Sequence, residues 1–101
     1  RRIYARGAEG LRRLGMRAPC LLSGSRAVPV AFYLGCRTGA TGGILRSTTP
    51  ARLVAAAHRE AAGILARGTS PPAYALSWTR HPLPGLGRHW SVYLPPWYRP
   101  S

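Results

Sequence analysis

The clearest pattern of hydrophobic and polar positions lies between residues 48 and 68. At the helical spacing of about 100° per residue, its main apolar side chains fall on one side, and these are Leu53, Ala57, Ala61 and Ile64. The opposite side carries the arginines Arg52, Arg59 and Arg67. The pattern predicts an amphipathic helix with a narrow basic stripe. Such a stripe can follow a phosphate backbone or simply solvate a surface helix.

Residues suited to helix ends flank this segment. Thr48 or Thr49 can act as the N-cap, and Pro50 fits the first turn, where its missing N–H costs nothing. Gly68 fits a C-terminal cap. We therefore expect one helix over about residues 50–67.

Residues 27–36 form the most apolar run of the chain. The run reads AVPVAFYLGC and is bounded by Arg26 and Arg37, with Pro29 inside it. A membrane-spanning helix needs about 20 apolar residues, and extending this run to residue 45 would bury Arg37 in the bilayer. A short buried strand or an interfacial segment is the preferred interpretation.

The C-terminal third, residues 69–101, differs sharply from the rest in composition. It holds seven of the ten prolines and all three tryptophans, and its paired prolines at 71–72 and 95–96 favour extended backbone. Residues 89–94 alternate loosely and can add one short strand. We expect an extended tail whose aromatic residues bury into a partner surface, namely Tyr74, Trp78, Trp90, Tyr93, Trp97 and Tyr98. Because several of them alternate with arginine or histidine, the same clusters can instead stack on unpaired RNA bases or lie at the headgroup level of a membrane.

Residues 1–26 are rich in arginine and nearly free of acids, as organellar presequences are. They are either the remnant of an import signal or a mature basic arm, with at most a short helix over about 8–17. The chain then divides into four segments, 1–26, 27–47, 48–68 and 69–101. The predicted fold class is mainly α with extended and irregular segments, without an independent compact core, so that the isolated chain is poorly folded.

Charge narrows the choice of function. The chain of 101 residues has a formal net charge of +13, and all 15 basic residues are arginine. Its only acids are Glu9 and Glu60, which leaves little for paired acid/base catalysis and nothing for a carboxylate Mg²⁺ or Ca²⁺ site. Without lysine there is no Schiff-base chemistry and no standard P-loop. A GC-rich genome can explain arginine in place of lysine, but not the missing acids, which point to a polyanionic partner.

The remaining polar residues give no recognisable catalytic or metal motif. Cys20 and Cys36 are more simply interpreted as two buried free thiols than as a disulfide, and no cysteine or histidine pair has the spacing of a zinc site. His58 is expected at the edge of the core, hydrogen-bonded or packed. The Gly-rich segment 35–43 can be a flexible turn or a phosphate cradle, but it lacks the P-loop ending.

The sequence therefore predicts a non-enzymatic structural protein of a mitochondrial ribosome, without cofactor or metal. It would bind rRNA phosphates and fill gaps between rRNA and neighbouring proteins in the matrix. The alternative is an accessory subunit of an inner-membrane complex, such as a respiratory complex or ATP synthase, whereas a free membrane-active peptide fits the ten prolines poorly. Clustering and helix phase select the RNA-binding candidates, which are Arg1, Arg2, Arg12, Arg13, Arg17, Arg37, Arg52, Arg59 and Arg67.

Overall fold

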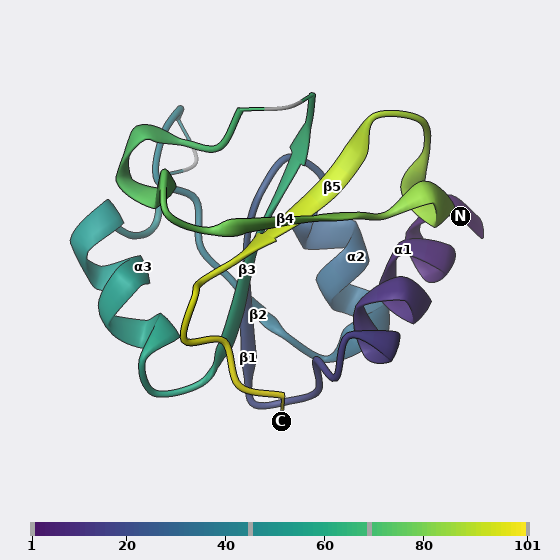
Figure 1. The fold of residues 1–101 in the computed structure, drawn as a ribbon, viewed down its shortest axis with the longest axis horizontal. Coiled ribbons are helices and arrows are strands. Elements are labelled where there is room, and N and C mark those ends of the chain that lie inside the picture. Colours follow the sequence, from purple (N-terminus) through teal and green to yellow (C-terminus); the bar gives the residue numbers. More distant parts are fainter. Residues whose placement is uncertain (1, 45, 69, 101) are drawn as a thin grey trace.

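Five strands pair into one mixed sheet in a computed structural model that describes residues 2–44, 46–68 and 70–100 (Figure 1). The strands are β1 (Cys20–Gly24), β2 (Arg37–Thr38), β3 (Ala61–Arg67), β4 (Thr79–Pro82) and β5 (Trp90–Leu94). Their order across the sheet is β2-β1-β3-β5-β4. β1 is parallel to β2 and β3, whereas β5 is antiparallel to both β3 and β4.

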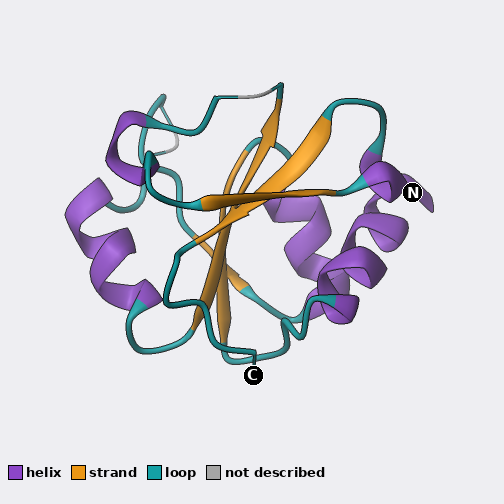
Figure 2. Ribbon diagram, viewed as in Figure 1, coloured by secondary structure: helices purple, strands orange, loops and turns teal. Residues whose placement is uncertain are grey.

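Helices cover both faces of this sheet, as Figures 1 and 2 show. The helices α1 (Arg2–Arg13) and α2 (Ala27–Leu34) pack against each other on one face, and α3 (Pro50–Ala57) covers the other. Two short 3-10 helices, η1 (Ala73–Ala75) and η2 (Pro84–Leu86), flank β4 along the chain. The sheet is therefore the middle layer of three.

Successive side chains of the central strands point to opposite faces of the sheet, so the core is divided into two clusters, one on each face. In β1, Cys20 and Leu22 point toward α1 and α2, while Leu21 points toward α3. In β3, Leu65 points toward α1 and α2, while Ile64 points toward α3. The Cα radius of gyration is 11.9 Å, close to the value of about 13 Å expected for a compact domain of this length.

The predicted fold class, mainly α without a compact core, is therefore wrong. The protein is an α/β domain whose apolar residues meet in two buried clusters, one on each side of the sheet. Strand pairing between distant segments produces this core: β1 lies beside β3, with Leu21 opposite Ala62 in the register. The segments look unable to form a core individually because each supplies at most one α-helix and only one or two strands to it.

The helix expected over 50–67 begins as predicted and ends early. Thr49 caps it, since the Arg52 N–H donates to the Thr49 hydroxyl at 3.2 Å, and Pro50 occupies its first turn. The helix stops at Ala57, and Ala61–Arg67 instead forms β3, with Ala61 to Leu65 all buried. A strand buried on both faces is apolar at consecutive positions, so its pattern resembles a continuation of the helix.

The C-terminal segment is not an extended tail. The strand expected at 89–94 is confirmed as β5, and β4 pairs with it as an edge strand that ends at Pro82. Other prolines lie where no strand hydrogen bond is lost: Pro72 precedes η1, and Pro84 begins η2.

Three further expectations are corrected in the N-terminal half. The basic arm contains the helix α1, which buries Ala8 and Leu11, and the strand β1, and the apolar run beginning at residue 27 is the helix α2 rather than a strand. Cys20 and Cys36 are joined in a disulfide and are not free thiols. Within the described ranges, no helix has the length and apolar character needed to cross a membrane.

Candidate anion-binding site

A groove of about 380 Å³ runs between the edge strand β2 and the helix α3. Three arginines from separate parts of the chain line it: Arg37 from β2, Arg52 from the first turns of α3, and Arg59 just after α3. No acidic side chain is among the lining residues. We refer to this hollow as the arginine groove.

A folded connection between β2 and α3 brings hydroxyl groups to the same place. Gly39 N–H donates to Leu22 O at 3.0 Å, which continues the pairing beside β1, and Ser47 N–H and Thr48 N–H both donate to Ala40 O. The Ser47 hydroxyl in return accepts from Ala40 N–H at 3.1 Å. These bonds close the connection into a loop and place Ser47 and Thr48, as well as Thr38, along the groove.

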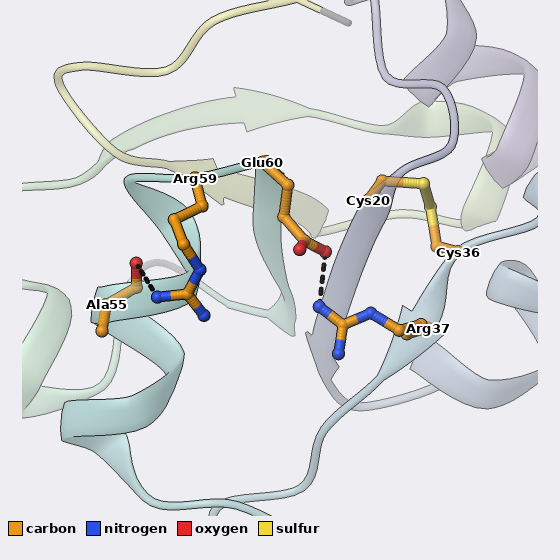
Figure 3. Close-up of polar contacts among 6 residues, drawn as sticks. All are labelled: Cys20, Cys36, Arg37, Ala55, Arg59 and Glu60. Atoms are coloured by element: carbon orange, nitrogen blue, oxygen red, sulfur yellow. Dashed lines mark hydrogen bonds and ion pairs between the residues drawn. A yellow bond between two sulfur atoms is a disulfide. The ribbon is translucent and has the colours of Figure 1, made fainter.

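Two of the three arginines are held by neighbours, as Figure 3 shows. The Arg37 guanidinium contacts the Glu60 carboxylate at 2.6 Å, and Arg59 turns back along α3 to donate to Ala55 O at 3.3 Å. The Arg37 side chain is nevertheless 65% exposed, so the pair is worth only about 0–1 kcal/mol. Glu60 therefore orients Arg37 at the groove while most of the Arg37 side chain remains exposed to solvent.

Arg52 differs from the other two groove arginines because no described residue holds its side chain. Its side chain makes no hydrogen bond or ion pair within the part of the chain that the structure describes, and it is exposed. An arginine presents five donors in a planar fork that matches phosphate oxygens. Arg52 is therefore ready to accept an anion in the groove without breaking a contact.

A second, smaller hollow of about 250 Å³ adjoins the arginine groove and shares Arg59 with it. Arg99 lines its far end, and its wall includes the rings of His58 and Trp97, which are stacked with centroids 4.0 Å apart. The expected place of His58, at the edge of the core, is therefore only partly right. Its ring is exposed and packs on a second aromatic ring.

The sheet separates the arginines predicted to bind RNA. Arg37, Arg52 and Arg59 meet at the groove, but Arg2, Arg12 and Arg13 lie on α1 across the sheet. Arg12 bonds there to Glu9 and to Tyr33 O. Arg17 follows α1 and Arg67 ends β3, whereas Arg1 is outside the described residues.

Most of the aromatic residues predicted to anchor a partner are used inside the protein. Trp78, Trp90 and Tyr93 are only 5%, 7% and 2% exposed and lie in the two core clusters, so their side chains do not reach a partner surface. Tyr74 and Tyr98 are partly buried against those clusters. Trp97, at 36%, is the most exposed member of the set.

The sequence alone does not identify the hydroxyl groups of the site. The one signal is the Gly-rich segment 35–43, whose composition suits a phosphate cradle and which contributes Arg37, Thr38 and Gly39 to the groove. Ser47 and Thr48 belong to the site because the loop folds back on Ala40, and no spacing in the sequence encodes that contact.

The arrangement can bind and orient an anion. Both cysteines are in the disulfide, and the described residues contain no group of three or more histidine, cysteine or acidic side chains placed to hold a metal ion. No protein family, curated protein or solved structure matches the chain. The functional conclusion therefore rests on the geometry of the site and on the net charge of the molecule.

Proposed function

We propose that the protein binds the phosphate backbone of RNA in the arginine groove and serves as a structural component rather than as an enzyme. The observation that supports this most directly is the meeting of Arg37, Arg52 and Arg59 from separate segments on one hollow beside the hydroxyls of Ser47 and Thr48. Arginine and hydroxyl groups are the usual protein contacts to phosphate oxygens.

The overall charge supports a polymeric anion as the ligand. A net charge of +13 on a compact body repels itself, and a chain of phosphates relieves that repulsion and releases counterions on binding. A small anion would neutralise only one or two of these arginines.

The test is a pair of matched double variants in the full-length chain. Arg52→Gln with Arg59→Gln removes two charges from the groove, and Arg2→Gln with Arg13→Gln removes two exposed charges from α1 on the other face of the sheet. We expect the groove variant to bind RNA about tenfold more weakly than the α1 variant. Its slope of log affinity against log salt should fall by about 0.7 per lost phosphate contact. Equal losses in both variants would exclude the groove as the site.

The proposed setting is the mitochondrial ribosome, because residues 1–26 have the arginine-rich, acid-poor composition of organellar presequences while forming α1 and β1 of the folded domain, as a mature basic arm would. Sedimentation of a detergent-solubilised mitochondrial lysate, with and without ribonuclease, tests this. A ribosomal component moves with a large particle and is released by ribonuclease. If ribonuclease leaves the sedimentation of the protein unchanged but detergent alters it, the result would instead support the inner-membrane alternative.

One surface feature favours that alternative, an accessory subunit at the inner membrane. The helix α2 exposes Val28 and Phe32, 69% and 81% accessible and four positions apart on one helical face. Exposed apolar side chains on a cationic molecule are typical of contact with an anionic lipid surface. Flotation with cardiolipin-containing vesicles measures this contact, which Val28→Ser with Phe32→Ser should abolish.

A further inference from the structure

The stacked pair of His58 and Trp97 is the feature that phosphate binding alone leaves without a role. The two rings are nearly parallel, with an interplanar angle of 8° and centroids 4.0 Å apart. Both residues are exposed, although a stack of this kind commonly lies in a core.

The protein itself fixes the position of this stack. Trp97 Nε1–H donates to Ala57 O at 3.0 Å, which ties the indole to the last residue of α3. The buried Trp78 ring also packs against the indole of Trp97 in an edge-to-face arrangement, with centroids 6.2 Å apart at 78°. His58, the residue that follows α3, packs on the fixed indole. The two rings therefore form a preorganised aromatic surface, which we call the aromatic platform.

Cations flank the aromatic platform. Arg59 lies between it and the arginine groove, and Arg99 lines the same hollow. Glu60 also lines it, but its carboxylate is paired with Arg37. Within the described residues the platform thus combines exposed ring surface with guanidinium groups at neighbouring positions. That combination is the one used to bind unpaired nucleotides, whose bases stack on rings while their phosphates contact arginine.

We infer that the protein selects single-stranded RNA, with one base stacked on the platform of His58 and Trp97 and the adjoining phosphates bound at Arg59 and Arg52. This inference rests on the proposed function and adds the class of RNA. A base inside a duplex is already stacked on its neighbours, so its face is not available to the platform. Base stacking on an aromatic side chain tolerates any sequence, so we expect little base preference.

The experiment compares three probes of equal phosphate number with the full-length protein: oligouridine, the same backbone without bases, and duplex RNA. We expect oligouridine to bind about tenfold more tightly than the abasic strand, by fluorescence anisotropy at fixed salt. Ring-proton signals of His58 should shift upfield with oligouridine and not with the abasic strand. Because this NMR measurement uses the unmodified protein, it does not depend on a variant folding.

The variant test replaces both rings, by His58→Leu with Trp97→Leu, because loss of His58 alone would expose the indole to the base. This variant should bind oligouridine and the abasic strand equally, whereas Arg52→Gln with Arg59→Gln should weaken both. Equal binding of all three probes by the native protein, without a shift at His58, would overturn the inference and leave the proposed function standing. Failure to bind any of the three would overturn both.

Discussion

At the scale of single residues, Tyr98 provides one of the contacts that hold the residues after β5 to the rest of the molecule. Its hydroxyl donates to Leu14 O at 3.0 Å, and burial raises the pKa of the Tyr98 hydroxyl above its usual value of 10.0. The neutral form is therefore the one that the folded state favours. Its contribution is fully present below the ordinary tyrosine pKa and is lost as the pH rises through the higher folded value.

This gives a pH-dependent prediction for Tyr98→Phe. At neutral pH the variant should be about 1 kcal/mol less stable than the native protein, because the hydrogen bond to Leu14 O is lost. Above pH ~10 the difference should shrink, since only the native protein loses stability by ionising this hydroxyl. Urea unfolding at several pH values measures the difference. A constant difference into the alkaline range would contradict the assigned cause.

Tyr93 is the opposite case, because its buried hydroxyl forms no hydrogen bond that would offset the loss of contact with water. The residue is 2% exposed, and its hydroxyl has no hydrogen-bond partner among the described residues. Tyr93→Phe should leave stability unchanged or raise it by up to about 1 kcal/mol, because an unsatisfied buried polar group is removed with little change in shape. Thermal unfolding of the two proteins measures this. A loss of more than about 1 kcal/mol would show that the hydroxyl has a partner.

At the scale of elements, local signals predicted where structure begins better than where it ends. Thr49 and Pro50 marked the start of α3 correctly, because capping depends on the backbone of the same few residues. The end of α3 depends on β3, whose place between β1 and β5 is a long-range contact. The arginine groove follows the same rule: helix phase grouped Arg52 with Arg59, but only the fold brings Arg37 to them.

The strand β2 is the shortest strand of the sheet and lies at its edge. It has two residues, both exposed, and it pairs with β1 alone at the edge of the sheet. The disulfide joins Cys36, directly before β2, to Cys20 at the start of β1 and closes a loop with a sequence separation of 16. This crosslink therefore holds the strand that carries Arg37 to the sheet.

Replacing both cysteines, by Cys20→Ala with Cys36→Ala, should lower the free energy of unfolding by about 2–4 kcal/mol, because the unfolded chain gains the entropy of an open loop. Chemical denaturation measures the change, and the native protein in excess reductant should move toward the same midpoint. Disulfides persist mainly in oxidising compartments, so trapping free thiols in cells with an alkylating reagent also tests the proposed matrix setting. Unchanged stability in the variant would show that β2 is held by other contacts.

At the scale of the whole molecule, the two faces of the sheet share one set of strands. Residues of β1 and β3 contribute alternately to both core clusters, so neither cluster can be lost without the other. The expectation of a poorly folded isolated chain came from judging each segment alone. In the structure, all four segments contribute strands to one sheet, so the chain forms a core without a partner.

The isolated protein should therefore unfold in a single cooperative transition, with circular dichroism and tryptophan fluorescence changing together. Added salt should raise the midpoint, because the charge of +13 repels itself, and RNA should raise it further by binding only the folded state. Thermal melts at several salt concentrations provide the measurement. A gradual or probe-dependent loss of structure would contradict a shared core.

Both edges of the sheet are poor templates for another strand. β2 offers only two residues, and β4 ends at Pro82, whose nitrogen has no proton to donate. Long unpaired edges recruit further strands and lead to aggregation. Copies gathered on one polyanion lose much of the charge repulsion that keeps them apart in solution. The short, interrupted edges then keep neighbouring sheets from joining, so copies bound to the RNA that we propose as the partner would not form fibrils.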